Sequence, residues 1–232
     1  MSGHLAHLGL NESEQMFAAR MEELSHRAQQ RSTPCFSHFL DERQQAIASQ
    51  AAADGVLRLY GGYPNAERVM LGIWPDFLEP SDQAFPIETV TFRFRKGMGI
   101  SHRDLLGTLM SLKIKREAIG DLLVGDALAV AFVSEAMVLP ILQEITKIGG
   151  VGVTCVRGMP ESLPAARKIE PHDGVVSSMR LDCVVALLAS VDRAEAQRLI
   201  RSGSIFRNAQ SVDSVSKETC EGDKLSIRGV GK

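Results

Sequence analysis

The residues ETVTFRFRKGMGISHRDLLGTLMSLKIKREAIGDLLVGDALAVAFV, numbered 88–133, contain the patterns from which we predict the central fold. Apolar side chains alternate with threonine and arginine over 88–95, as in a strand that buries one face. Residues 101–112 have helical spacing, and Ser101 is a residue type that caps helix N-termini. A strand followed by a helix is therefore expected at the start of this region.

Downstream residues complete this pattern. The apolar runs 118–124 and 128–133 predict two strands joined by a tight turn. A helix is expected over 136–148, with Pro140 in its first turns or at a kink, and a last strand over 151–157. The order β-α-β-β-α-β is that of a ferredoxin-like sandwich, which many RNA-recognition domains share and which also serves unrelated functions.

The first part of the chain is predicted to be helical and to close with a hairpin. Helices are expected over 16–30 and over 36–53, and Gly55 favours termination of the second helix. Apolar runs at 56–60 and 68–74 then predict two strands joined by a turn.

The C-terminal region is predicted to contain two helices followed by short strands. A first helix over 180–189 has apolar residues at i, i+3, i+4 and i+7, namely Leu181, Val184, Val185 and Leu188. Asp192 is placed to cap a second helix, which Gly203 ends. A strand is expected from residue 204 to 208, and residues 220–229 are expected to form a turn at Gly222-Asp223 followed by another strand.

Together these patterns predict an α+β protein with three modules. A helical module with a hairpin occupies 1–84, and a ferredoxin-like, RRM-like RNA-binding module occupies 85–160. A connector over 161–178 has no steady periodicity. A small domain over 179–232 ends the chain.

Composition excludes several classes of protein. The chain has 232 residues, 44% of them hydrophobic and 23% charged, which is typical of globular domains. No apolar run approaches the roughly 20 residues of a membrane helix, and the first residues lack the pattern of a secretory signal. We therefore expect a cytoplasmic protein without membrane contact. The four cysteines form no CxxC pair, so we expect reduced thiols and neither a metal site nor a cofactor.

Charge is distributed unevenly along the chain. Residues 1–92 carry 6 Lys+Arg and 12 Asp+Glu, a net charge of −6. Residues 93–232 carry 20 Lys+Arg and 16 Asp+Glu, a net charge of +4. A polyanion is therefore expected to bind the second part, and the acidic first part to face a protein partner or another surface without RNA.

A row of arginine and amide side chains is expected on the outward face of the second C-terminal helix. Arg193, Gln197 and Arg201 fall at i, i+4 and i+8. Arginine donates paired hydrogen bonds to phosphate oxygens, and glutamine reaches phosphates or sugar hydroxyls without adding charge. The alternative is a solvated amphipathic helix, with which the spacing also agrees. The candidate RNA-binding residues of this region are Arg180, Arg193, Gln197, Arg198, Arg201, Ser202 and Asn208.

A second cationic cluster lies in the middle of the chain. Residues 93–117 carry seven Lys+Arg against Asp104 and Glu117, a net charge of +5. This pattern agrees equally with two alternatives: a surface that contacts an RNA backbone, and a solvated face. No pair of exposed aromatic rings is evident for base stacking. The candidate RNA-binding residues here are Arg93, Arg95, His102, Arg103, Lys113, Lys115 and Arg116.

Catalytic patterns are weak. GMG (97–99) before SHRD (101–104) is neither a GxGxxG fingerprint nor a P-loop, and its glycines are better explained by a tight turn. Asp182, within RLD (180–182), is interpreted as a first-turn acid or as the partner of a nearby arginine. No nucleophile and base pair is recognised elsewhere, so an enzyme is not expected.

The spacing of residues across the C-terminal region carries further information. The positions concerned are Arg180-Leu181-Asp182, Asp192-Arg193, Ala196, Leu199-Ile200, Gly203, Asn208 and Gly222-Asp223. Together they resemble the S4-type RNA-binding domain, the small αL motif of a ribosomal small-subunit protein, some pseudouridine synthases and tyrosyl-tRNA synthetases. The chain departs from that family at Asp192, where Ser is frequent, and after Gly203, where the family favours a Val-x-Val-Asn-Gly-like strand. The resemblance implies that the face carrying Arg180, Arg193, Gln197 and Arg201 meets structured RNA.

The middle and the end of the chain carry a second resemblance. SHRDLLGTLMSLKIKREAIGDLLV (101–124) is similar to the central signature of the YlmH family, and SIRGVGK (226–232) resembles that family's terminus. These bacterial proteins have an N-terminal module, a ferredoxin-like middle and a C-terminal S4-type domain. They are similar to factors that bind the large ribosomal subunit carrying stalled peptidyl-tRNA, are implicated in ribosome-associated quality control, and have older links to cell division.

From the residues and these resemblances we expect an RNA-binding, ribosome-associated protein without chemistry of its own. It would contact 23S rRNA, peptidyl-tRNA or both on the large subunit, in ribosome rescue or quality control. One alternative is an RNA-modifying enzyme, of the pseudouridine synthase or methyltransferase type, with a divergent catalytic module. Another is an interaction protein of the cell-division machinery.

Overall fold

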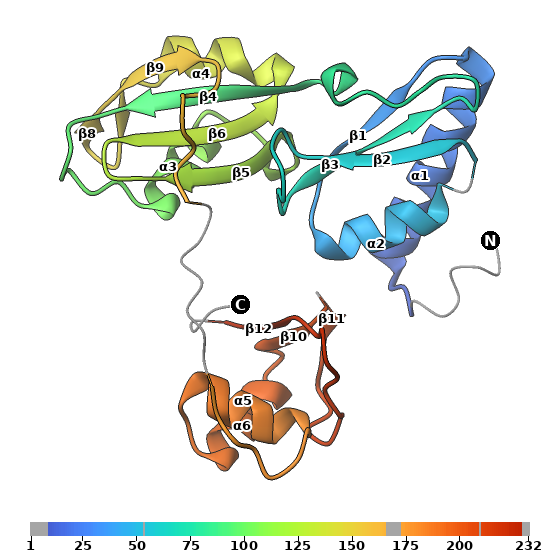
Figure 1. The fold of residues 1–232 in the computed structure, drawn as a ribbon, viewed down its shortest axis with the longest axis vertical. Coiled ribbons are helices and arrows are strands. Elements are labelled where there is room, and N and C mark those ends of the chain that lie inside the picture. The colour runs from blue at the N-terminus through green and yellow to red at the C-terminus, as the bar shows by residue number, and fades with distance from the viewer. Residues whose placement is uncertain (1–8, 53, 166–172, 209, 229–232) are drawn as a thin grey trace. The chain divides into compact units, whose positions relative to one another are not determined.

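The computed structural model describes residues 9–52, 54–165, 173–208 and 210–228 (Figure 1). The chain divides into two compact units, Met1–Lys168 and Ile169–Lys232. Helices combine with antiparallel sheets in both units, which confirms the predicted α+β class. Among the described residues, no helix has the length and apolar character needed to span a membrane.

The N-terminal part of the first unit packs two helices against a three-stranded antiparallel sheet of order β1-β3-β2. Its elements are α1 (Glu12–Arg31), β1 (Cys35–Leu40), α2 (Glu42–Ala51), β2 (Val56–Tyr60) and β3 (Val69–Trp74). Leu71 and Ile73 of the central strand β3 face the helices, and Met70 and Trp74 face a second core on the other side. Every residue of β3 is buried, because both faces of this sheet are covered.

The predicted helix over 36–53 is wrong at its start. Residues Cys35–Leu40 form β1, which pairs antiparallel with β3. Asp41 then caps α2: its side chain accepts a hydrogen bond from the backbone N–H of Gln44, and the Gln44 side chain accepts one from the Asp41 N–H. The strand forms because Leu40 reaches the core beneath the helices and Phe36 and Phe39 reach the core on the other face of the sheet, a tertiary gain that outweighs local helical spacing.

The second part of the first unit is a four-stranded antiparallel sheet of order β5-β6-β4-β9, with α3 and α4 on one face (Figure 1). Its elements are β4 (Ile87–Arg93), α3 (His102–Ser111), β5 (Ile119–Val124), β6 (Leu128–Ser134), α4 (Val138–Glu144), β7 (Lys147–Ile148), β8 (Val151–Gly152) and β9 (Thr154–Arg157). This order is the ferredoxin-like arrangement that the sequence predicts. The predicted strand over 151–157 is divided, because β8 pairs with β7 and only β9 joins the sheet.

Apolar side chains cover both faces of this second sheet. On one face Phe92 packs in a core with Leu105 of α3 and Ile141 of α4. On the other face Phe132 stacks on Tyr63 of the N-terminal part, with ring centroids 4.7 Å apart. The two parts of the first unit therefore share a core.

The shared core changes the environment of the polar face of β4. Thr91 was expected on an outward face, but it is 2% exposed and its Oγ1 donates to the carbonyl oxygen of Gly158 at 2.7 Å. Arg93, at the end of the strand, is exposed. The period-two alternation is correct, but the second face of the strand meets protein over most of its length.

A polar network also joins the two sheets of the first unit. Asp121 of β5 accepts hydrogen bonds from the Tyr63 hydroxyl at 2.8 Å and from the backbone N–H groups of Glu67 and Arg68 at 2.7 and 3.1 Å. The Arg68 Nε–H donates to the carbonyl oxygen of Ile119 at 3.0 Å. These bonds connect the turn between β2 and β3 to β5.

The second unit contains two helices and a small antiparallel sheet of order β11-β10-β12. Its elements are α5 (Leu181–Ala189), α6 (Arg193–Arg201), β10 (Ile205–Arg207), β11 (Gln210–Ser211) and β12 (Leu225–Ile227). As predicted, Asp192 caps α6 by accepting from the Glu195 N–H at 2.8 Å, and Gly203, with φ +70°, follows its end. The sequence did not predict β11. Gly229 of the predicted last strand lies outside the described residues, as does the rest of the terminal segment 229–232.

The core of the second unit differs from the predicted apolar stripe. Leu181 and Val185 are fully buried with Ala196 and Ile200 of α6, as expected. Leu188 was predicted to be part of the stripe, but it is 37% exposed. The buried stripe is narrower than predicted because α5 is covered mainly by α6 and the small sheet.

Candidate nucleic-acid interface

A buried carboxylate organises the polar residues of the second unit. Asp182 is the second residue of α5, and its side chain is fully buried. Arg180, which immediately precedes the helix, donates from Nε to one carboxylate oxygen at 3.1 Å and from Nη2 to the other at 3.2 Å. The backbone N–H of Cys183 donates to Asp182 as well, at 3.1 Å. The interpretation of Asp182 as the partner of a nearby arginine is confirmed.

Helix α6 supplies two more donors to the same carboxylate. Arg193 donates from Nε to Asp182 Oδ2 at 2.9 Å, and Gln197 donates from Nε2 to the same oxygen at 3.1 Å. Asp192 fixes where α6 begins. Residues four apart lie on one helix face, so both side chains lie on the face toward α5. The side chains of Arg180 and Arg193 nevertheless keep 36% and 55% of their surface exposed.

The electrostatics of this cluster follow from its geometry. Hydrogen bonds from Arg180, and then from Arg193 and Gln197, hold the pKa of Asp182 well below its ordinary value, against the opposing effect of burial. The same contact raises the pKa of Arg180. The carboxylate is therefore ionised, and two guanidinium groups against one carboxylate leave a local excess of one positive charge.

The outward row predicted on α6 is corrected by these contacts. Arg193 and Gln197 turn toward Asp182, while Arg201 is exposed and forms no ion pair within the described part of the chain. Arg198 is exposed and pairs with Glu195, one turn before it. The spacing at i, i+4 and i+8 placed the residues on one face correctly, but it could not show that a buried acid from another helix would hold two of them.

Two other predicted residues of this unit have their polar groups engaged locally. The Ser202 hydroxyl donates to the carbonyl oxygen of Leu199 at 2.9 Å. Asn208, with φ +50°, donates from Nδ2 to Asp223 at 2.9 Å and accepts from the Lys224 N–H at 2.9 Å. The Asn208 side chain therefore links the end of β10 to the residues just before β12.

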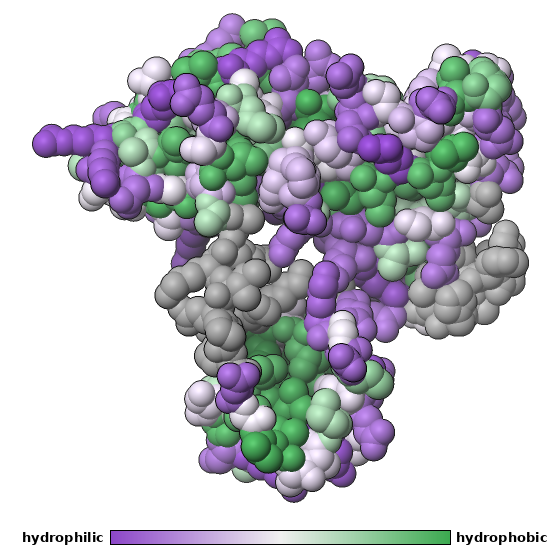
Figure 2. Space-filling model, in the orientation of Figure 1, coloured by the Kyte–Doolittle hydropathy of each residue, from purple (hydrophilic) through white to green (hydrophobic). Residues whose placement is uncertain are grey.

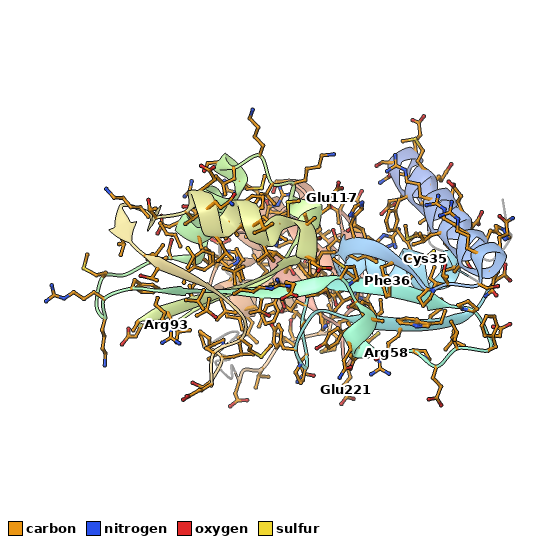
Figure 3. The ribbon with its side chains drawn as sticks, turned by 90° about the horizontal axis from the view of Figure 1, so that it is seen from above. Cys35, Phe36, Arg58, Arg93, Glu117 and Glu221 are labelled. Atoms are coloured by element: carbon orange, nitrogen blue, oxygen red, sulfur yellow. The ribbon has the colours of Figure 1, made fainter. Side chains whose placement is uncertain are left out.

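The middle cluster separates into two groups. Arg93, Arg95, His102 and Arg103 are exposed and come from the end of β4, the following loop and the first turn of α3. Arg93 lies at the end of β4, on the side of the sheet away from α3 and α4 (Figure 3). Hydrophilic side chains cover the end of the first unit where this loop lies (Figure 2).

The helix start beside this loop is fixed by a capping box. Ser101 accepts from the Asp104 N–H at 3.1 Å, and Asp104 accepts from the Ser101 N–H at 3.0 Å. The Ser101 hydroxyl also donates to Asp104 Oδ2 at 2.6 Å, and this bond, followed by the one from the Ser101 N–H, lowers the pKa of Asp104. The acid is therefore used to orient α3, as the sequence indicates. The exposed Lys147, which the sequence did not single out, lies on β7, and β7 contacts α3.

Lys113 and Lys115 form the other group, beyond the C-terminal end of α3, and both are exposed. Arg103 lies in the first turn of α3, and the helix of ten residues, about 15 Å long, separates the two groups. Lys115 lies 3.8 Å from Glu117 in an exposed pair, which contributes little to stability. The predicted cluster is thus continuous in sequence but not in space.

Arg116 is the one member of this cluster that the structure removes from the candidate surface. Its Nη1 donates to the carbonyl oxygens of Ile119 and Gly120 at 2.6 and 3.3 Å. Burial, and then the nearby charge of Arg68, lower the pKa of Arg116 to about 10. The side chain turns into the junction between the two sheets, where it supplies donors to backbone carbonyl groups.

Both candidate surfaces are suited to phosphate groups. Around Asp182, arginine donors that are already oriented, with an amide beside them, match the oxygens of a nucleic-acid backbone, and the middle group offers exposed positive charge. Among the described residues no group of three His, Cys, Asp or Glu could hold a metal ion.

Comparisons with known proteins agree with this description. Residues 80–159 match the family model described as "Putative RNA-binding domain in YlmH". A relative, "Ribosome-associated protein quality control protein P2" of Bacillus subtilis (strain 168), is 32% identical over 198 residues, which are 84% of this chain and 77% of the relative. The solved "Cell division protein ylmH from Streptococcus pneumoniae" shares the fold, with a TM-score of 0.58 at 17% identity, over 65% of this chain and 93% of that one. The chain described here belongs to the YlmH family.

Proposed function

We propose that the protein binds structured RNA of the large ribosomal subunit in the cytoplasm and serves ribosome-associated quality control without chemistry of its own. The observation that carries the proposal is the cluster in which Asp182 orients Arg180, Arg193 and Gln197 while leaving both arginines accessible. Donors of this kind suit a phosphate backbone. The S4-type resemblance of the same residues and the name of the Bacillus subtilis relative support the same function.

The middle of the chain supplies the second contact in this proposal. Arg93, Arg95, His102 and Arg103 would meet the backbone of the same RNA or of a bound tRNA, and Lys113 and Lys115 a neighbouring segment. Their exposure and the family-model match over 80–159 support this assignment. The partner would be 23S rRNA, peptidyl-tRNA or both.

The acidic N-terminal part has a different role in the proposal. A net charge of −6 over residues 1–92 opposes contact with a phosphate backbone. We assign this part to a protein partner or to a surface without RNA. The protein would then act by occupying a surface of the RNA, and not by catalysing a reaction.

The proposal is tested by co-sedimentation of the full chain with purified bacterial ribosomal subunits at two salt concentrations. We expect stoichiometric association with the large subunit that decreases at higher salt. Arg198→Glu with Arg201→Glu reverses two exposed charges without touching Asp182, and should abolish the association. Arg193→Glu is a poorer choice, because it would place a second carboxylate beside Asp182.

A matched control makes the same change of charge on the N-terminal helix α1, with Arg27→Glu and Arg31→Glu. This variant should associate like the unmodified chain. The proposal is rejected if the wild-type protein does not sediment with the large subunit. It is also rejected if the double variant on α6 sediments with the subunit as the wild type does. Loss of a specific RNA modification in cells without the protein would point instead to an enzyme, and RNA-independent co-purification with division proteins to that machinery.

A further inference from the structure

A negative charge at the centre of a proposed RNA-binding surface requires an explanation. Phosphate groups repel a carboxylate, so an acid at this position opposes binding if charge alone matters. Asp182 is nevertheless fully buried between Arg180, Arg193 and Gln197, and accepts five hydrogen bonds from described residues. A buried carboxylate is tolerated in a protein only when it is paired and hydrogen-bonded in this way.

The contacts restrict the arginines while leaving them available. Arg193 uses its Nε–H on Asp182, and Arg180 uses Nε and Nη2. More than half of the Arg193 side chain and about a third of the Arg180 side chain remain exposed. Arginine has many rotamers in solution, and holding it in one orientation before binding removes the ordering cost from the binding step.

The donors come from two different helices. Arg180 precedes α5, and Arg193 and Gln197 lie on α6, so the carboxylate fixes their positions relative to each other. A fixed arrangement of donors favours phosphates at defined spacing, as in folded RNA, over a flexible chain whose phosphates have no fixed geometry.

We propose that Asp182 is a positioning residue of the RNA-binding surface, and that its carboxylate aligns Arg180, Arg193 and Gln197 for the phosphates of folded RNA. The inference rests on the proposed function. It predicts that removal of the negative charge weakens binding to folded RNA, which is the opposite of what net charge predicts.

Asp182→Asn in the full chain provides the test, with purified bacterial large ribosomal subunits as the folded probe and poly(U) as the flexible polyanion. We expect affinity for the subunit to fall about tenfold, the effect of losing one hydrogen bond to a charged group. Affinity for poly(U) should stay the same or rise. Subunit binding that is as tight as or tighter than that of the wild type would overturn the inference.

A matched charge control is Glu195→Gln, which also converts an acid to its amide on the same unit. Glu195 pairs with Arg198 and does not contact Asp182 through its side chain. Positioning predicts that only Asp182→Asn weakens subunit binding, and a charge effect predicts that both variants bind both probes more tightly.

A spectroscopic signature separates positioning from a general loss of structure. The Nε–H protons of Arg180 and Arg193 should give slowly exchanging NMR signals in the wild type, and Asp182→Asn should broaden or remove them while the backbone spectrum of α5 and α6 is retained. Unchanged Nε–H signals would contradict the inference.

Arg180→Lys serves if Asp182→Asn does not fold. It keeps the positive charge but removes the paired donors to Asp182, so subunit binding should fall while poly(U) binding is retained. If Arg180→Lys binds each probe with the same affinity as the wild type does, the inference is overturned. If the wild type itself shows no preference for the subunit over poly(U), the proposed function fails, whatever the variants do.

Discussion

The hydroxyl of Tyr63 donates to Asp121 Oδ2 at 2.8 Å, joining two residues that lie 58 positions apart in the chain. Tyr63 belongs to the turn between β2 and β3, and Asp121 to β5 of the second sheet. The same carboxylate accepts from the backbone N–H groups of Glu67 and Arg68. One acid thus links the N-terminal sheet to the ferredoxin-like sheet of the first unit.

Tyr63→Phe should therefore reduce the stability of the first unit. The change keeps the ring stacked on Phe132 but leaves the Asp121 carboxylate with one donor fewer. Hydrogen bonds to charged groups contribute about 1.5–3 kcal/mol, so we expect a loss of about 2 kcal/mol in urea unfolding. Tyr60→Phe is the control and should change the unfolding free energy by less than about 0.5 kcal/mol. Equal midpoints for Tyr63→Phe and wild type would show that this bond is not needed.

Arg116→Ala should destabilise the protein without changing RNA contacts. The substitution removes the Arg116 donors to the carbonyl oxygens of Ile119 and Gly120, of which Ile119 keeps only the bond from Arg68, at a cost of about 1–2 kcal/mol. Thermal unfolding measures this loss, and Lys115→Ala, an exposed neighbour, should cost less than about 0.5 kcal/mol. The salt dependence of subunit binding by folded Arg116→Ala should match the wild type; a shallower dependence would restore Arg116 to the RNA-binding surface.

Acid should destabilise the second unit over a defined pH range because of Asp223. The Arg207 guanidinium and then the Cys220 N–H lower the pKa of Asp223 to about 2. An aspartate in the unfolded chain has a pKa of about 3.9. Because the folded pKa is the lower one, the stabilisation is complete above about pH 4 and is lost as the pH falls toward 2. Asp223→Asn should flatten the fall of unfolding free energy across this range, and an unchanged profile would contradict the assignment.

Arg201→Gln should weaken association with the large subunit in a salt-dependent manner. Arg201 is exposed, so its loss removes a phosphate contact without disturbing Asp182. We expect the slope of log affinity against log salt concentration to decrease by about 1. A parallel titration of Arg31→Gln, on α1, should give the wild-type slope. Identical slopes for Arg201→Gln and wild type would place Arg201 outside the RNA contact.

The sequence was sufficient to predict most of the elements because their signals are local. The strand over 88–95, the Ser101 and Asp192 caps, and Gly203 after α6 depend on signals within a few residues, and the structure confirms these features, although β4 ends at Arg93 and buries both faces over most of its length. The start of the second predicted helix was wrong because β1 is stabilised by pairing with β3, which local spacing does not report.

The candidate site was predicted less completely, because burial depends on elements distant in sequence. Arg116 and Lys115 are adjacent and look alike in the sequence, but one turns into the junction between two sheets and the other into solvent. In the same way, the helical spacing of Arg193 and Gln197 gave their common face but not their shared contact with Asp182. A charged residue could be assigned to a surface only after the packing partners were known.

Crosslinking of the full chain to purified bacterial large ribosomal subunits, read at nucleotide and peptide resolution, tests the central claim most directly. We predict that peptides of α6 around Arg193 and Arg201, and of the loop before α3, crosslink to defined nucleotides of large-subunit RNA or bound tRNA. Crosslinks confined to ribosomal proteins, or to RNA through α1 and α2 alone, would contradict the claim that these cationic surfaces hold RNA.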